Sequence, residues 1–192
     1  MATLKRKVTL TTKDEEAYVS VKQLMVSLKW TAAVDLDLMA FYKTKDGRTG
    51  GVFSDNYPGG DLGSLNSFPF IELSGDEGFD DNKEAKSENE EIIRITKLDD
   101  MAELYIVTIN YDDAVDNKSS TFSNYDGSVT VTNDKGDAVE VLLNSRDKGH
   151  VAVICKIDNT SPMGARLINK NDIMDLAQFA ETIPGAHLIV NA

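Results

Sequence analysis

The sequence predicts an all-β protein: a β-sandwich of two mainly antiparallel sheets with long acidic loops and one short C-terminal helix. Short segments alternate apolar and polar residues with a period of two, as strands with one buried face do. Turn signals recur between these segments, and helical spacing of apolar residues occurs only near the end of the chain. About ten short strands and one late helix are typical of a sandwich rather than of an α/β fold. The 192 residues are expected to form a single domain, 1–192.

The first part of the chain is expected to form strands within 8–30 and again from 34 to 42. Apolar residues in 24–30 alternate with polar or small ones up to Trp30, and 13–16 is a polar turn. The next strand has two different faces. One is apolar and consists of Leu36, Leu38, Ala40 and Tyr42; the other comprises Asp35, Asp37, Met39 and Phe41. Asp46-Gly47 then marks a tight hairpin turn, because glycine accepts positive φ.

The rest of the chain continues the β pattern. In the middle of the chain, a loop is predicted at 55–69, a short strand at 68–73 and a further strand that starts at 92. A turn at 97–101 leads to a central strand at 103–110, and a loop at 111–126 follows with Phe122 in the core. In the C-terminal part, a hairpin of 128–132 and 138–143, a buried strand at 150–157 and a short strand at 166–169 are predicted. A helix follows, which Asn171 or Asp172 caps and Pro184-Gly185 ends. Its helical spacing comes from Ile173, Leu176, Ala177 and Ala180.

Composition restricts the possible partners. The net charge is −12 and the isoelectric point is near 4.5, which argues against binding of nucleic acid and favours cations or basic partners. No stretch approaches the ~20 apolar residues of a membrane span. The N-terminus lacks the apolar region of a signal peptide, and Cys155 is the single cysteine, so a cytoplasmic location is expected.

The stretch 72–91 concentrates negative charge. Nine acidic and two basic side chains give it −7 of the total charge of −12. Such a block repels itself unless something neutralises it. Loop carboxylates suit Ca²⁺, which takes several oxygen ligands in irregular geometry; a solvated linker is the alternative.

Asp35 and Asp37 form a second acidic feature. They lie two residues apart on a strand, so both carboxylates project from one face. Like charges so close are unfavourable without a cation or a basic partner. The alternative is a strand end that dips into solvent, but the apolar strand that follows favours a cation.

The sequence contains little that indicates catalysis. His150 and His187 lie in no recognisable motif, Cys155 has the apolar flanks of a core residue, and Trp30 is expected to pack in the core. Zinc clusters, a P-loop and a dinucleotide fingerprint are absent from the sequence. An EF-hand is excluded because Ala85 stands where its turn glycine belongs. We therefore expect no enzymatic activity.

Several ordered landmarks resemble the tellurium-resistance TerD-type family. The opening carries Val8-Thr-Leu-Thr-Thr, Leu24-Met-Val-Ser-Leu-Lys-Trp30 and Val34-Asp-Leu-Asp-Leu-Met-Ala-Phe41. The acidic loop begins with Gly75-Asp76 and ends with Asn89-Glu90-Glu91 before Ile92-Ile93, where the family closes with Asp-Asp-Glu. The strand 103–110, Phe122 and the 129–143 hairpin continue the likeness, which spans about residues 4–170.

The resemblance implies a β-sandwich that binds Ca²⁺ in loops, within a cytoplasmic bacterial stress system linked to tellurite and other chemical resistance. Its implied ligands are the Asp-Leu-Asp pair, the leading aspartate and the closing acids: Asp35, Asp37, Asp76, Glu90 and Glu91. Glu77, Asp80 and Asp81 are expected as additional ligands. The partners expected are calcium ions and other proteins of the same stress system. The alternative is a metal-free interaction module whose acidic face docks a basic partner.

Overall fold

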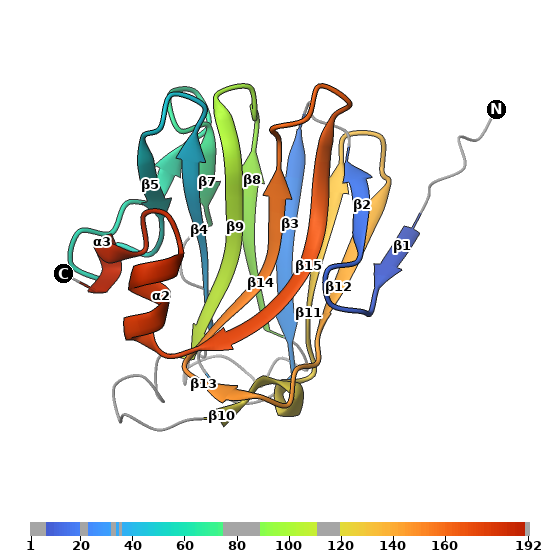
Figure 1. Cartoon of the computed structure of the whole chain (residues 1–192), viewed down its shortest axis with the longest axis vertical. Coiled ribbons are helices and arrows are strands. Elements are labelled where there is room, and N and C mark those ends of the chain that lie inside the picture. The colour runs from blue at the N-terminus through green and yellow to red at the C-terminus, as the bar shows by residue number, and fades with distance from the viewer. Residues whose placement is uncertain are drawn as a thin grey trace.

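The computed structural model describes residues 7–19, 23–31, 34, 36–74, 89–110 and 120–190. Within these residues two sheets pack face to face, so the predicted sandwich is confirmed (Figure 1). The seven-stranded sheet contains, in spatial order, β1 (Lys7–Leu10), β12 (Ala138–Leu143), β11 (Gly127–Asn133), β3 (Leu24–Trp30), β8 (Asn89–Ile95), β7 (Ile71–Leu73) and β6 (Gly63–Ser64).

The six-stranded sheet forms the second layer. Its order is β2 (Glu16–Val19), β15 (Ala165–Met174), β14 (Val151–Asp158), β9 (Met101–Asn110), β4 (Leu36–Thr44) and β5 (Thr49–Val52). A separate pair is formed by β10 (Ser120–Thr121) and β13 (Lys148–Gly149), next to the 3₁₀ helix η1 (Phe122–Tyr125). Among the described strands, the pairing of β1 with β12 is parallel and the others are antiparallel.

Most predicted strands occur where the period-two pattern placed them. The β11–β12 hairpin pairs Val129 with Val141, and the β4–β5 hairpin turns at Gly47 with a φ of 90°. Phe122 and Trp30 are fully buried, as expected. The strand predicted at 68–73 begins only at Ile71, because Pro69 has no N–H to donate to a ladder.

The C-terminal part differs from the prediction. The last strand does not end at 169 but continues to Met174, and it passes through Asn171 with a positive φ of 43°. The helix α2 (Leu176–Thr182) is capped by Asp175, whose Oδ1 accepts from the amide of Gln178 at 2.8 Å, and not by Asn171 or Asp172. A second short helix, α3 (His187–Val190), follows it.

Two clusters of apolar side chains hold the molecule together. The larger one lies between the sheets and includes Trp30 and Leu38. The smaller one lies on the outer face of the six-stranded sheet, where α2 and α3 cover it (Figure 1). These two helices are called the helical cap below, and Phe179 of α2 is fully buried beneath it. Both faces of β4 are therefore buried over most of its length.

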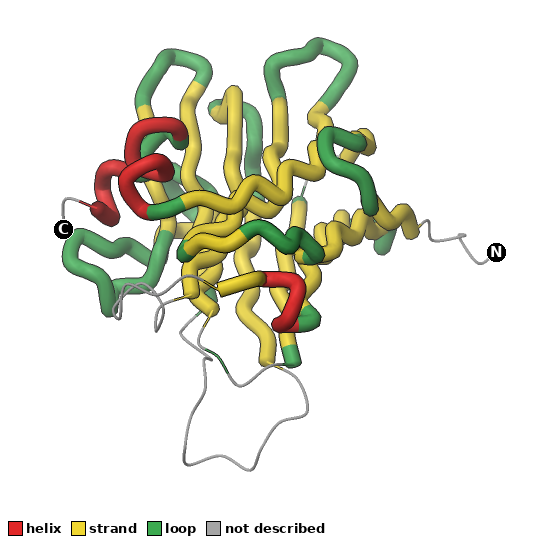
Figure 2. The backbone as a smooth tube through the Cα atoms, turned by 60° about the horizontal axis from the view of Figure 1, so that its bottom comes forward, coloured by secondary structure: helices red, strands yellow, loops and turns green. Residues whose placement is uncertain are grey.

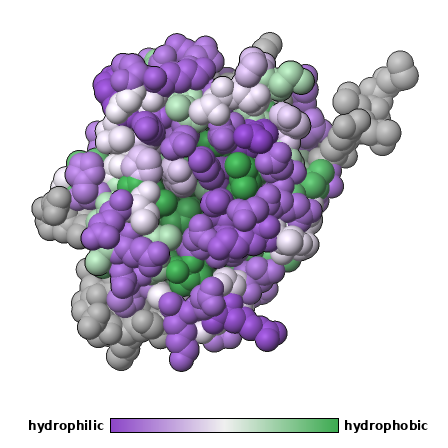
Figure 3. All heavy atoms as spheres, in the orientation of Figure 1, coloured by the Kyte–Doolittle hydropathy of each residue, from purple (hydrophilic) through white to green (hydrophobic). Residues whose placement is uncertain are grey.

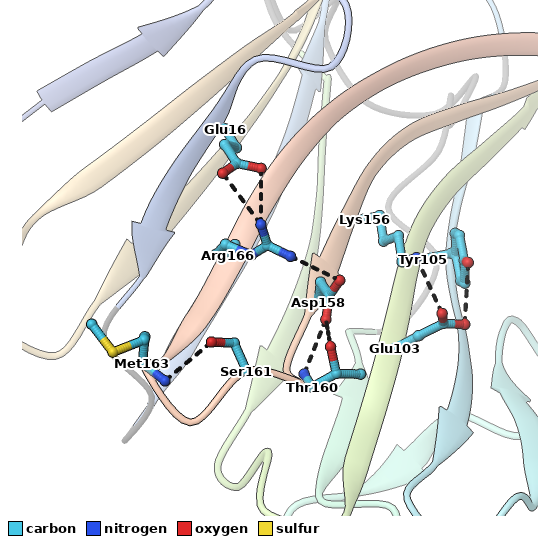
Figure 4. A network of polar contacts seen from close by, with 9 residues as sticks. All are labelled: Glu16, Glu103, Tyr105, Lys156, Asp158, Thr160, Ser161, Met163 and Arg166. Atoms are coloured by element: carbon cyan, nitrogen blue, oxygen red, sulfur yellow. Dashed lines mark hydrogen bonds and ion pairs between the residues drawn. The ribbon is translucent and has the colours of Figure 1, made fainter.

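The remainder of that outer face is mostly polar, with a few apolar residues between the polar ones (Figure 3). Its side chains form ion pairs and hydrogen bonds between neighbouring strands (Figure 4). Arg166 bridges Glu16 and Asp158, while Glu103 binds both Lys156 and the hydroxyl of Tyr105. Tyr105 of this network also packs against the smaller apolar cluster that α2 and α3 cover. In the described part of the chain, each helix is too short or too polar to cross a membrane.

Candidate metal centre

Asp37 is buried on the outer face of the six-stranded sheet. Strand alternation places it on the side of Met39 and Phe41, as predicted, and its register partner on β9 is Ile109. It is only 6% exposed. The hydroxyl of Tyr57 donates to its Oδ2 at 2.5 Å, so the loop that follows β5 covers this carboxylate.

Glu91 reaches the same strand from the other sheet. It lies on β8, is 3% exposed, and its Oε2 accepts from the backbone amide of Leu38 at 2.6 Å. The described ladder between β4 and β5 ends at the pair Ala40–Val52, and Glu91 binds the β4 amide beyond that point. A carboxylate there supplies the acceptor that a strand partner supplies elsewhere. Glu91 thus binds the amide of the residue that follows Asp37, whose own side chain lies on the outer face of the sheet.

Trp30 fixes the connection between β3 and β4. Its indole Nε1 donates to the carbonyl of Val34 at 2.9 Å, and its own carbonyl accepts from Nδ2 of Asn89 at 3.4 Å. Hydrogen bonds of Trp30 therefore connect Asn89, near the end of the acidic stretch, with Val34, which precedes Asp37 by three residues. Asn89 stands where the TerD-type pattern has an aspartate, and here its amide acts as a donor.

Glu90 is separated from Glu91. Adjacent residues of a strand point to opposite faces, and Glu90 pairs with Lys29 of β3, with 3.4 Å between Oε2 and Nζ. Both side chains are partly exposed. The other predicted ligands, Asp35, Asp76, Glu77, Asp80 and Asp81, lie outside the described residues.

The short pair β10–β13 and the helix η1 lie at this end of the sandwich (Figure 2). Polar residues that the sequence did not mark form hydrogen bonds here. Asn110 pairs in register with Leu36, and its Nδ2 donates to the hydroxyl of Tyr125 at 2.7 Å. The carbonyl of His150 accepts from the amide of Asn110 at 3.0 Å. The available signal was Asn110 itself, a polar residue at the end of an apolar strand.

The donor chemistry of Asp37 and Glu91 fits a hard cation. Ca²⁺ takes six to eight oxygen ligands, commonly carboxylates and carbonyls. Within the described ranges, no group of three or more His, Cys, Asp or Glu side chains is arranged to hold a metal. Two carboxylates do not make up this number, and the other predicted loop ligands and Asp35 lie outside the described residues.

Solved structures provide the comparison. The chain is similar to the crystal structure of a homologue of the telluride resistance protein TerD from Streptomyces coelicolor A3(2), with 17% identity, a TM-score of 0.50, and coverage of 84% of this chain and 96% of that one. It is also similar to a protein of unknown function, with 13% identity, a TM-score of 0.51, and coverage of 83% and 95%. No protein-family model and no curated protein matches the chain. The chain therefore shares the fold of a TerD homologue.

Proposed function

We propose that this chain is a non-enzymatic Ca²⁺-binding β-sandwich protein of the TerD type. Asp37 and Glu91 would hold the cation, together with Asp35 and the acids of the loop, Asp76, Glu77, Asp80 and Asp81. Glu90 is left out because it faces the other side of its sheet and pairs with Lys29.

Two buried carboxylates beside one segment of β4 carry this proposal. Asp37 lies on β4 itself, and Glu91 of the other sheet accepts a hydrogen bond from the amide of Leu38, the residue that follows Asp37. The hydroxyl of Tyr57 donates to Asp37, and the backbone amide of Leu38 donates to Glu91. Burial of charge is unfavourable unless it is compensated, and the acidic stretch ends on the same strand as Glu91. A cation would neutralise both carboxylates and fasten this loop to β4.

The likeness to the TerD homologue agrees with a role in chemical stress, and we extend the proposal to that setting. We place it in the cytoplasm, because the single cysteine is a buried free thiol rather than part of a disulfide. Other proteins of the same stress system are the partners we propose.

Thermal melts with Ca²⁺ and with EDTA test the proposal. A ligand that binds only the folded state stabilises it by about 2.7 kcal/mol at a hundredfold excess over Kd. We expect Ca²⁺ to raise the Tm of the wild type, and Asp37→Asn or Glu91→Gln to remove most of that rise. Both amides keep an oxygen that can accept the existing hydrogen bond, so each variant should fold.

Glu103→Gln is the matched control. Glu103 lies on the same face of the sheet but pairs in register with Lys43, at the opposite end of β4 from Asp37. Its variant should keep the full Ca²⁺-dependent rise in Tm. A wild-type Tm that ignores Ca²⁺ would contradict the proposal, and salt-sensitive capture of a basic partner would then favour the metal-free interaction module.

A further inference from the structure

We infer that a groove between β1 and β2 binds an aliphatic primary amine in its protonated form. The hydrocarbon chain of the ligand would lie between the two sheets, and its ammonium group would bind Asp137. The inference goes beyond the proposed function and does not rest on it, because it uses residues at the β1–β2 edge that do not belong to the candidate calcium site.

The groove lies where the two sheets end at one lateral edge of the sandwich. β1 is the edge strand of the seven-stranded sheet and β2 is the edge strand of the six-stranded sheet, and both lie on the same side of the molecule (Figure 1). Each has four residues, and in the described part of the chain each pairs with one strand, β12 or β15. The groove between them has a volume of about 310 Å³. This volume is at the lower end of the range for small-molecule sites.

The surface of the groove is mainly aliphatic. Leu24, Val131 and Val139 belong to the buried core and are at most 7% exposed. On the other sheet, Ala17 and Val19 pack against the same core from β2. A hydrocarbon chain in this space would remove its own surface and that of the groove from water, which is favourable. The aliphatic side chains that line the groove are Val8, Ala17, Val19, Leu24, Val131 and Val139.

Asn133 and Asp137 give the groove a polar end. They flank the turn between β11 and β12, where the amide of Asn133 donates to the carbonyl of Asp137 at 3.0 Å. Nδ2 of Asn133 also donates to Oδ2 of Asp137 at 3.3 Å, so the two side chains lie on the same face of the hairpin. Strand alternation makes this the face of Val131 and Val139. A half-buried carboxylate therefore lies beside the aliphatic surface.

This carboxylate decides which head group the groove accepts. It can only accept hydrogen bonds, and its two oxygens offer about four lone-pair positions, so it can bind a donor of the ligand in addition to Asn133. Asp137 is the charged residue among the described ones that line the groove. An ammonium group supplies both hydrogen-bond donors and the opposite charge. The carboxylate of a fatty acid would instead be repelled by Asp137 and by the net charge of −12.

Octylammonium is the probe for this site, and octanol and octanoate carry the same chain with a neutral and an anionic head group. NMR titration of the full chain at about 0.15 M salt, where exposed charges are screened beyond about 8 Å, measures each Kd. It also locates the ligand through the shifts of the methyl groups of Ala17, Val19, Val131 and Val139. We expect saturable binding at these methyl groups, tightest for octylammonium and weakest for octanoate.

Asp137→Asn tests the role of the carboxylate. We expect it to weaken the binding of octylammonium about tenfold, as the loss of a hydrogen bond to a charged group does, and to leave that of octanol unchanged. The variant should fold, because its amide oxygen can still accept from Asn133.

Glu140→Gln is the matched control. It removes the same charge from β12, but Glu140 lies on the opposite face from Val139, where its Oε2 is 3.7 Å from Nζ of Lys7. This variant should bind octylammonium as the wild type does. Ala17→Leu places a larger side chain in the groove and should weaken the binding of both octylammonium and octanol.

Several results would overturn the inference. These are no saturable binding of octylammonium by the wild type, equal binding of octanoate, equal binding of octylammonium by Asp137→Asn, or shifts confined to methyl groups outside the groove. Dimerisation in analytical ultracentrifugation that Ala17→Leu abolishes would show that a second copy of the chain occupies the groove, and would also overturn it. Calcium binding is measured separately, so either proposal can fail without the other.

Discussion

At the scale of single residues, the candidate site shows which roles a sequence can predict. Asp37 was marked as one of two aspartates that precede an apolar strand, and Glu91 as a closing acid of the family resemblance; both side chains are buried. Tyr57 was not marked, because nothing in the 55–69 loop distinguishes the residue that will face Asp37. The role of Glu91 as acceptor for the Leu38 amide could not be predicted either, since it depends on how one sheet lies on the other.

Cys155 gives a prediction about pH. Burial raises the pKa of its thiol from 9.0 to about 12. The unfolded chain therefore loses this proton at lower pH than the folded protein, so stability falls as pH rises from about 9 towards 12. The loss from this group approaches about 1.4 kcal/mol per pH unit within that window.

Urea unfolding of the wild type and of Cys155→Ala checks this prediction. The alanine variant should be less stable near neutral pH, because it leaves a cavity in the core. Its deficit should shrink as pH rises above about 9, since it no longer carries the thiol. A deficit that stays constant with pH would contradict the burial argument.

At the scale of elements, structure that depends on contiguous residues could be predicted from the sequence. Structure that depends on pairing between distant residues could not. The β11–β12 hairpin could be predicted because its turn and its alternation are contiguous in sequence. The end of β15 could not, because the strand continues through Asn171 while it pairs with β14 across a register shift between Val153 and Cys155. Ile173, which helical spacing assigned to the helix, packs against the core from this strand.

The start of α2 supplies a second prediction. Asp175→Ala removes the acceptor for the Gln178 amide and should lower the free energy of unfolding by about 0.5–2 kcal/mol. Asp172→Ala is the control, because Asp172 lies on β15 and pairs with the exposed Lys13. Exposed pairs contribute about 0–1 kcal/mol, so this change should be the smaller. Chemical denaturation measures the free energy of unfolding of both variants. An equal or larger loss for Asp172→Ala would show that Asp175 is not the residue that caps α2.

At the scale of the whole molecule, the sandwich could be predicted from strand number, turn frequency and the order of landmarks. The pairing order could not, because strands far apart in sequence become neighbours, as β1 and β12 do. The sequence predicted one helix near the C-terminus, but not that α2 and α3 cover part of the outer face of the six-stranded sheet. The main anchor of the helical cap, Phe179, was not singled out, yet its buried ring meets Phe41 of β4 edge to face at 5.2 Å between centroids.

Calorimetric titration of the chelator-treated wild-type protein with Ca²⁺ shows whether the candidate site binds the cation. The titration should be run at about 0.15 M salt, where exposed charges are largely screened beyond about 8 Å. We predict saturable binding of Ca²⁺ that Asp37→Asn weakens strongly and Glu103→Gln leaves intact. Absence of saturable binding by the wild type, or equal binding by Asp37→Asn, would rule out the proposed calcium site.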